Sequence, residues 1–265
     1  MTPPTTRRTR PVLVTLSVVA MAATAALPAS AAPNEVVYDA LGDSYAAGSG
    51  ASTAYAYVLD GRMKIALDDF AAVGGATVPT MLTGQLDALD PDTDLVTVSI
   101  GGNDIGWGDV VQACVAFDEP MCQGAVAQTA QLIQTALPGL LHGAYSAVRT
   151  EAPDAHVVVT GYPRLFSPEF GDYAPFPGAP LMLTVEEQQM LNDGADLLNQ
   201  VTAGVAQQHG FQFVDVTRRF TGHGVNAPDA WLTDFSATVP LHPTDQGQHA
   251  YGVALTSQIN PRSLR

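Results

Sequence analysis

Ser44 is the residue of this sequence best placed for nucleophilic chemistry. It ends the triplet Gly42–Asp43–Ser44, which directly follows the short apolar run Val36–Leu41. A β-branched, apolar run of this length predicts a buried strand, and the small residues after it allow a sharp turn. Open α/β sheets bind their ligands at the carboxyl ends of their strands. A serine in that turn can expose its hydroxyl to an ester carbonyl, although the triplet alone also suits an ordinary turn.

Two further glycine-containing turns could bring hydrogen-bond donors to the same place. Gly75 follows a weaker strand candidate at residues 64–73, and Asn103 follows the clear strand 94–100. Because parallel strands end at one edge of a sheet, these turns can converge with the turn of Ser44. The N–H groups of Ser44 and Gly75 and the amide of Asn103 would then bind the oxyanion that develops during ester hydrolysis. The alternatives are that Gly75 is a plain turn glycine and Asn103 a helix cap.

A histidine is expected as the base that takes the serine proton near neutral pH. We choose His242 because it lies in irregular chain directly before Pro243 and a helix start, where it can be held at the sheet edge. His223, in a glycine-rich loop, is the weaker option. The remaining histidines lie in or beside predicted helices and strands and are expected to be structural or solvent-exposed: His142, His156, His209 and His249.

The elements that must position these groups alternate between strands and helices. Further strands are predicted at residues 156–161 and 211–216, and helices near 55–60, 80–89, from 107, 124–150 with a break at Pro138, 184–209 and 244–257. This alternation predicts an α/β fold with a mostly parallel sheet and helices on both faces. The long loop at residues 165–183 is rich in Pro, Gly and aromatic residues. It either lines a substrate groove or, as we prefer, packs on the sheet.

The start of the chain predicts export. Three arginines at positions 7, 8 and 10 precede the apolar run Val12–Leu27, and Ala29–Ser30–Ala31 has the small-x-small pattern that signal peptidase cleaves. We therefore expect residues 1–31 to be a signal peptide and residues 32–265 to be a single secreted domain.

Composition narrows the classes of partner. The 265-residue chain carries 11 Lys+Arg against 26 Asp+Glu, which gives a net charge of −15. This negative charge disfavours binding to nucleic acid or to an anionic membrane through a basic face. No run after the signal region is long and apolar enough for stable membrane insertion. We expect a monomer that acts on a small-molecule or lipid ester. Cys114 and Cys122, the only cysteines, are expected to form a disulfide in an exported protein rather than a metal site.

Taken together, these motifs resemble those of the SGNH (GDSL) hydrolases, in particular the secreted esterases and lipases of actinobacteria. Gly42–Asp43–Ser44, Gly75, Gly101–Gly102–Asn103–Asp104 and His242–Pro243 stand in the order of the four blocks of that family, across nearly the whole mature chain. The resemblance implies a flavodoxin-like three-layer α/β/α sandwich and carboxylic-ester hydrolysis with no metal and no cofactor. It also implies that Ser44 is the nucleophile and His242 the general base, with an oxyanion hole formed by Ser44, Gly75 and Asn103.

The sequence departs from the family pattern at the group that orients the histidine. The common pattern has aspartate three residues before the histidine, where this chain has Val239. We therefore predict a Ser–His dyad whose imidazole is oriented by a main-chain carbonyl of the segment 236–239, specifically that of Val239. Asp234 and Asp245 are the side-chain alternatives.

The predicted function is a secreted serine esterase or lipase that works through an acyl-enzyme on Ser44. A phospholipase or a polysaccharide acetyl esterase would use the same site. The alternative from another class is an exported binding protein that keeps the fold without turnover. A complete set of serine, glycine, asparagine and histidine favours the enzyme.

Overall fold

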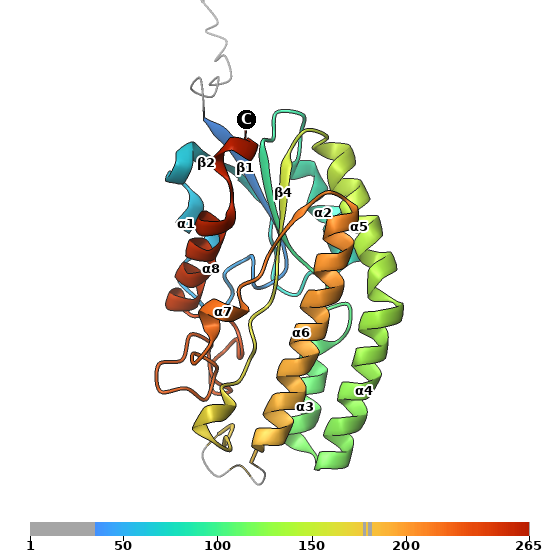
Figure 1. The fold of residues 1–265 in the computed structure, drawn as a ribbon, viewed down its shortest axis with the longest axis vertical. Helices are drawn as coiled ribbons and strands as arrows, with labels where there is room; N and C mark the ends of the chain where they lie inside the picture. Colours follow the sequence, from blue (N-terminus) through green and yellow to red (C-terminus); the bar gives the residue numbers. More distant parts are fainter. Residues whose placement is uncertain (1–34, 177–178, 180–181, 265) are drawn as a thin grey trace, which may run out of the picture. The chain divides into compact units, whose positions relative to one another are not determined.

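The computed structural model describes residues 35–176, 179 and 182–264, so the signal peptide predicted over residues 1–31 lies outside the described residues. A five-stranded sheet forms the middle layer, in the order β2-β1-β3-β4-β5 (Figure 1). All its pairings are parallel, which confirms the predicted sheet. The strands are β1 (Val36–Gly42), β2 (Ile65–Phe70), β3 (Leu95–Ser99), β4 (His156–Thr160) and β5 (Gln212–Val214).

This strand order creates a crevice at the centre of the sheet. After β1 the chain adds β2 on one side and then crosses back to place β3 on the other side. Order 2-1-3-4-5 is the flavodoxin-like arrangement, in which ligands bind beyond the carboxyl ends of β1 and β3. The turns that contain Ser44 and Asn103 follow these two strands, so the topology brings both to the crevice.

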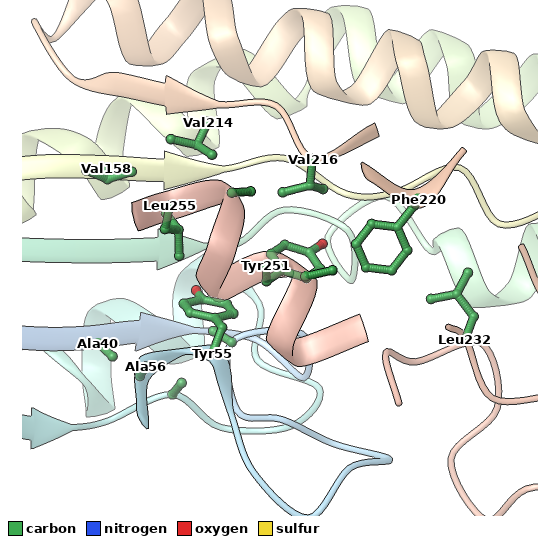
Figure 2. Packing of buried hydrophobic residues seen from close by; sticks show 14 of the residues in the cluster. Ala40, Tyr55, Ala56, Val158, Val214, Val216, Phe220, Leu232, Tyr251 and Leu255 are labelled. Atoms are coloured by element: carbon green, nitrogen blue, oxygen red, sulfur yellow. The ribbon is translucent and has the colours of Figure 1, made fainter. Parts of the chain in front are cut away.

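Helices cover both faces of the sheet, because alternate strand residues are apolar on both sides. Val158 of β4 packs in one core, with Tyr55 and Tyr251 from the helices of that face (Figure 2). Its neighbours Val157 and Val159 pack in the other core. The helices are α1 (Tyr55–Leu59), α2 (Val78–Gly84), α3 (Trp107–Ala116), α4 (Glu119–Thr135), α5 (Leu137–Glu151), α6 (Val185–Gln208), α7 (Thr217–Phe220) and α8 (Asp245–Gln258), with short 3-10 turns at Arg62–Lys64, Leu86–Ala88, Pro168–Phe170 and Pro261–Leu264.

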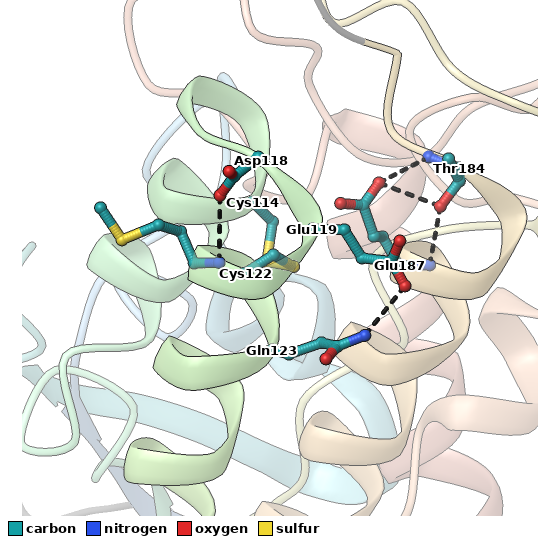
Figure 3. The surroundings of a disulfide bond; sticks show 8 residues. Cys114, Asp118, Glu119, Cys122, Gln123, Thr184 and Glu187 are labelled. Atoms are coloured by element: carbon teal, nitrogen blue, oxygen red, sulfur yellow. Dashed lines mark hydrogen bonds between the residues drawn. A yellow bond between two sulfur atoms is a disulfide. The ribbon is translucent and has the colours of Figure 1, made fainter.

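Two local features stabilise helix ends: a disulfide between α3 and α4, and a capping box at the start of α6. Cys114 and Cys122 form the predicted disulfide, which joins the last turn of α3 to the first turn of α4 (Figure 3). Closing so short a loop adds about 2.5 kcal/mol of stability in the chain-entropy model. Thr184 and Glu187 form a capping box at the start of α6, in which each side chain accepts a hydrogen bond from the other residue's N–H.

The predicted helix at 124–150 is two helices. α4 ends at Thr135 and α5 begins at Leu137, so Pro138 lies in the first turn of α5, where its missing N–H leaves no hydrogen bond unmade. Among the described residues, none of the helices has the length and apolar character needed to cross a membrane.

Candidate active site

Ser44 lies in a turn that is locked against the end of β3. Gly42 has a φ of +132°, and a Cβ there would lie 2.3 Å from the carbonyl oxygen of Ser99. The N–H of Asp43 donates to that same oxygen over 2.7 Å. Only glycine allows the two strand ends to approach so closely. The candidate nucleophile is therefore fixed by backbone contacts within the sheet.

The structure brings His242 to Ser44. The imidazole Nε2 lies 2.7 Å from Ser44 Oγ, and Nδ1 lies 2.7 Å from the carbonyl oxygen of Pro240. A carbonyl can only accept, so Nδ1 carries the proton and Nε2 is the acceptor for the serine hydroxyl. Burial lowers the pKa of His242 below its usual 6.5, and the bond to Pro240 partly opposes that shift. The ring is therefore neutral near pH 7, as a general base must be.

The carbonyl that orients the imidazole differs from the one predicted. The carbonyl of Val239 makes no hydrogen bond to the ring and instead accepts one from Thr233 Oγ1 over 2.6 Å. Leu241 adopts a left-handed conformation with φ of +62°, and the carbonyl of Pro240 lies at the ring instead. The structure thus places at Nδ1 the carbonyl one residue after the predicted Val239.

The two aspartates considered as alternatives bind elsewhere. The carboxylate of Asp234 accepts from the N–H and the hydroxyl of Ser236, over 2.9 and 2.6 Å. The carboxylate of Asp245 accepts from the N–H and hydroxyl of Ser52. Neither carboxylate is hydrogen-bonded to the imidazole of His242, whose partners among the described residues are Pro240 and Ser44.

The Gly75 turn is joined to the Asn103 turn, and Asn103 lines the same cavity as Ser44. Asn103 Nδ2 donates to the carbonyl of Ala76 over 2.9 Å, which joins the two turns directly. Gly75 has a φ of +76°, a conformation that favours glycine. Among the described residues, the N–H groups of Ser44 and Gly75 meet no acceptor. Two unpaired N–H groups and an amide with one hydrogen to spare are the donors that an oxyanion requires.

The other histidines have partners of their own. His223 stacks on Trp231 with ring centroids 3.7 Å apart, so the weaker option for the base is not brought to Ser44. The rest bond to neighbouring side chains or lie on a helix surface: His142 with His209, His156 with Gln212, and the exposed His249.

A buried polar group that was not predicted from the sequence lies directly beside Ser44. The Asp43 carboxylate is 1% exposed and accepts from Tyr162 Oη at 2.5 Å, Tyr45 N at 3.0 Å and Ser99 Oγ at 3.3 Å. Burial raises the pKa of Asp43 to about 6, against the effect of these hydrogen bonds. Tyr162 follows β4 by two residues, so its place at the carboxyl edge of the sheet was the available indication.

A cavity of about 780 Å³ opens next to Ser44 and His242. One wall is a face of α3, on which the lining residues recur at helical spacing: Trp107, Gly108, Val111, Gln112, Val115 and Ala116. Phe176 and Phe235 add aromatic surface, and most of the lining is apolar. Leu165 and Phe166 are buried, and Leu165 and Phe176 line the cavity. The described part of the long loop at residues 165–183 therefore both packs on the core and contributes to the groove.

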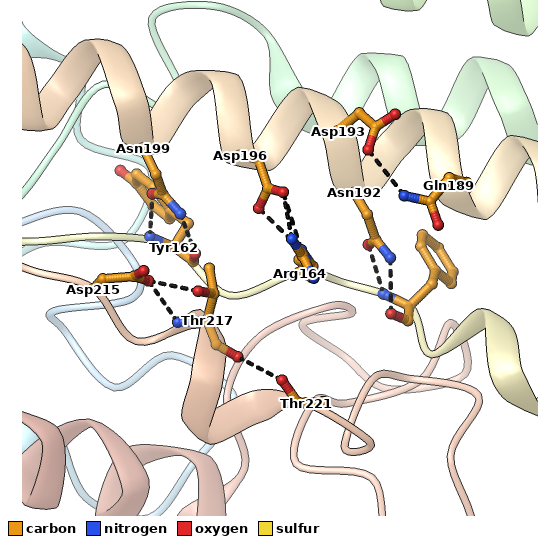
Figure 4. Close-up of polar contacts among 11 residues, drawn as sticks. Tyr162, Arg164, Gln189, Asn192, Asp193, Asp196, Asn199, Asp215, Thr217 and Thr221 are labelled. Carbon is orange, nitrogen blue, oxygen red and sulfur yellow. Dashed lines mark hydrogen bonds and ion pairs between the residues drawn. The ribbon is translucent and has the colours of Figure 1, made fainter.

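The chain that leaves β4 forms another part of this wall and is held by side chains of α6 (Figure 4). Asn199 accepts from the N–H of Tyr162 over 2.8 Å and donates to its carbonyl over 2.7 Å. Asn192, seven residues earlier on α6, bonds both main-chain groups of Phe166 in the same way. These amides satisfy the main-chain groups of Tyr162 and Phe166 and fix the cavity wall.

Comparisons with known proteins agree with this architecture. Residues 40–250 match the model of the GDSL-like Lipase/Acylhydrolase family. Lipase 1 of Streptomyces coelicolor is 37% identical over 227 residues, which cover 80% of this chain and 82% of that protein. A lipase of Streptomyces rimosus is 35% identical over 228 residues, with 80% and 82% covered.

Solved structures point to the same family. The phospholipase A1 of Streptomyces albidoflavus superposes with a TM-score of 0.78 at 35% identity, covering 85% of this chain and 100% of that one. The extracellular lipase of Streptomyces rimosus gives a TM-score of 0.76 at 33% identity, covering 84% and 100%. The chain therefore belongs to the GDSL-like lipase/acylhydrolase family and is a carboxylic-ester hydrolase.

Proposed function

We propose that the enzyme hydrolyses esters through an acyl-enzyme on Ser44, with His242 as the general base. The observation that carries the proposal is the 2.7 Å contact between Ser44 Oγ and His242 Nε2. Oγ attacks the ester carbonyl carbon while its proton moves to Nε2. The carbonyl oxygen becomes an oxyanion that the N–H groups of Ser44 and Gly75 and the amide of Asn103 bind.

The second half of the reaction uses the same groups. The tetrahedral intermediate collapses, the C–O bond to the alcohol breaks, and the imidazolium gives its proton to the departing oxygen. Water then loses a proton to Nε2 and attacks the acyl carbon, and the returning proton frees Ser44 with release of the carboxylic acid. Throughout, the Pro240 carbonyl accepts from Nδ1–H over 2.7 Å and keeps the ring in the required tautomer.

The preferred substrates in this proposal are esters with an apolar acyl chain. An apolar groove beside Ser44, with α3 as one wall, gains affinity for each methylene that it removes from water, roughly 0.8 kcal/mol apiece. An acetyl group would leave most of this surface unused, so the groove disfavours a polysaccharide acetyl esterase. A phospholipase is the second candidate, supported by the likeness to the phospholipase A1 of Streptomyces albidoflavus.

Secretion is part of the proposal. The predicted signal peptide over residues 1–31 supports it, and the similar Streptomyces rimosus structure is described as an extracellular lipase. Expression of the whole chain in an actinobacterial host should release a protein into the medium whose first residue is Ala32. Retention in the cell with the leader intact would contradict export.

The decisive experiment compares Ser44→Ala with Ser49→Ala, a change to another serine of the same turn. Both variants and the wild type are assayed on p-nitrophenyl esters from acetate to palmitate and on a phosphatidylcholine, and then treated with an organophosphonate. We expect Ser44→Ala alone to lose activity and covalent labelling, with the wild type preferring longer acyl chains to acetate. Turnover or labelling that survives in Ser44→Ala would refute the mechanism. A wild type without any labelling would favour the non-catalytic binding protein.

A further inference from the structure

We propose that Tyr162 is a positioning residue for ester hydrolysis, because its hydroxyl sets the distance between the Ser44 turn and the Asn103 turn. The Tyr162 hydroxyl makes no hydrogen bond to Ser44 or Asn103. It bonds the residue that precedes each of them, Asp43 and Gly102. The proposal rests on the proposed function of Ser44 as nucleophile and Asn103 as oxyanion donor.

One hydroxyl makes both connections. Tyr162 Oη donates to Asp43 Oδ2 over 2.5 Å and accepts from the N–H of Gly102 over 3.2 Å. A phenol has one hydrogen to donate and lone pairs to accept, so the two bonds coexist. The nucleophile turn after β1 and the oxyanion turn after β3 are thereby tied through a side chain that follows β4.

Tyr162 is itself held firmly enough to act as a fixed point. Its main-chain N–H and carbonyl are both bonded to Asn199 of α6 (Figure 4). Its side chain is buried, and its ring meets the ring of Tyr45 edge-on at 5.2 Å. A Cβ on Gly102 would lie 3.3 Å from the Tyr162 ring, so the oxyanion turn packs directly against it. A shift of the hydroxyl would be passed on to both turns.

The bond to Asp43 has a second consequence. Asp43 is buried, and its raised pKa of about 6 reflects the cost of keeping a charge there. The Tyr162 hydroxyl is one of the donors that favour the charged carboxylate. Without it, the carboxylate must take up a proton or move toward another donor, and Ser44 is the next residue in the chain. Charge-assisted hydrogen bonds of this kind are stronger than neutral ones.

The first test is Tyr162→Phe, which keeps the ring that lines the cavity and removes only the hydroxyl. We expect kcat to fall about tenfold to hundredfold, as for loss of one preorganised electrostatic contact, with KM almost unchanged. Tyr38→Phe is the matched control, since it removes a buried hydroxyl bonded to Thr97 over 2.7 Å inside the core. It should lower thermal stability by a similar amount and change kcat by less than about twofold. Equal losses of kcat in both variants would refute a specific positioning role.

The second test asks whether Tyr162 acts through the oxyanion turn. In an Asn103→Ala background the oxyanion donor is already gone, so adding Tyr162→Phe should cost much less in kcat than it does in the wild type. A cost in kcat that stays the same would show that the hydroxyl acts independently of the oxyanion turn, and would overturn the proposal. The Ser44→Ala variant distinguishes a failure of the proposed function from a failure of the role proposed for Tyr162. Activity retained there refutes the proposed function and this role with it, whereas an inactive Ser44→Ala beside a fully active Tyr162→Phe refutes this role alone.

Discussion

The two halves of the active site are held in place by different means. The nucleophile turn is built on the ends of β1 and β3, where Gly42 fits directly against Ser99 and the carboxylate of Asp43 is buried. His242 lies in residues 221–244, which contain no helix or strand. We call these two regions the sheet frame and the histidine loop. The first is fixed by close packing of strand backbone, and the second by hydrogen bonds within the loop, from its backbone and from side chains.

Two side chains, those of Tyr45 and Thr233, make hydrogen bonds that hold the histidine loop near His242. Tyr45 Oη donates to the carbonyl of Leu241 over 2.7 Å, and the Thr233 hydroxyl accepts from the N–H of His242 over 3.0 Å. The same Thr233 hydroxyl donates to Val239. A change in the sheet frame should therefore cost stability first, whereas a change in the histidine loop should cost activity while the fold survives.

The largest effect is expected from His242→Ala. Loss of the general base should reduce kcat by about 10⁴-fold, because the serine hydroxyl can no longer transfer its proton in the transition state. The melting temperature should stay within a few degrees of the wild type, because His242 itself is not part of the buried core. His223→Ala in the same loop is the control and should retain activity. A loss below about tenfold in His242→Ala would remove the imidazole from the mechanism.

The opposite pattern is expected in the sheet frame. Gly42→Ala would force a Cβ to within 2.3 Å of Ser99 O at a φ of +132° and should destabilise the fold by about 3 kcal/mol or more. Gly143→Ala is the control, because a Cβ at this position of α5 meets no atom within 4 Å. It should be stabilising by about 1 kcal/mol. Urea unfolding of both variants measures the difference, and a Gly42→Ala protein as stable as the wild type would contradict a tightly packed frame.

A smaller effect is expected where one hydroxyl supports the histidine loop. Thr233→Val keeps the shape of the side chain and removes its bonds to Val239 and His242. We expect kcat to fall about tenfold, since the imidazole loses part of its alignment. Asp234→Ala should change kcat by less than about twofold, because its carboxylate bonds only within its own turn. The reverse order of effects would identify Asp234 as the group that orients the ring.

The smallest expected effect is a shift in the pH dependence of kcat/KM. Burial lowers the pKa of His242 below 6.5, so the neutral base form persists to lower pH than for a free histidine. Hence kcat/KM should be level near pH 7 and fall only as the pH drops through a midpoint below 6.5. Measurements on a soluble p-nitrophenyl ester from pH 4 to 9 test this. A midpoint above about pH 7 would mean that a neighbouring charge, rather than burial, governs the imidazole.

Sequence patterns predicted the sheet frame better than the histidine loop. The strands are apolar and β-branched, and the carboxyl-edge rule then places Ser44 beside Asn103 without further information. His242 could be chosen from its place before Pro243. We predicted the carbonyl of Val239, not that of Pro240, as the acceptor at His242 Nδ1. Which carbonyl reaches the ring depends on the left-handed backbone of Leu241, which no local sequence pattern encodes.

Two other features could not be predicted from the sequence, for different reasons. α7 spans only Thr217–Phe220, too short for a helical period to show. The contact of Tyr162 with Asp43 joins residues 119 positions apart, so only the folded topology reveals it. The disulfide and the capping box of α6 were predictable because both depend on residues close together in the chain.

The amides of α6 that bind residues 162–166 also bear on how the protein behaves at high concentration. A stretch of extended backbone with free N–H and C=O groups is a template on which another molecule can add a strand and begin to aggregate. Asn192 and Asn199 occupy those groups at Phe166 and Tyr162 from within the same molecule. Here the protein's own helix keeps the main-chain groups of Tyr162 and Phe166 from pairing with another molecule.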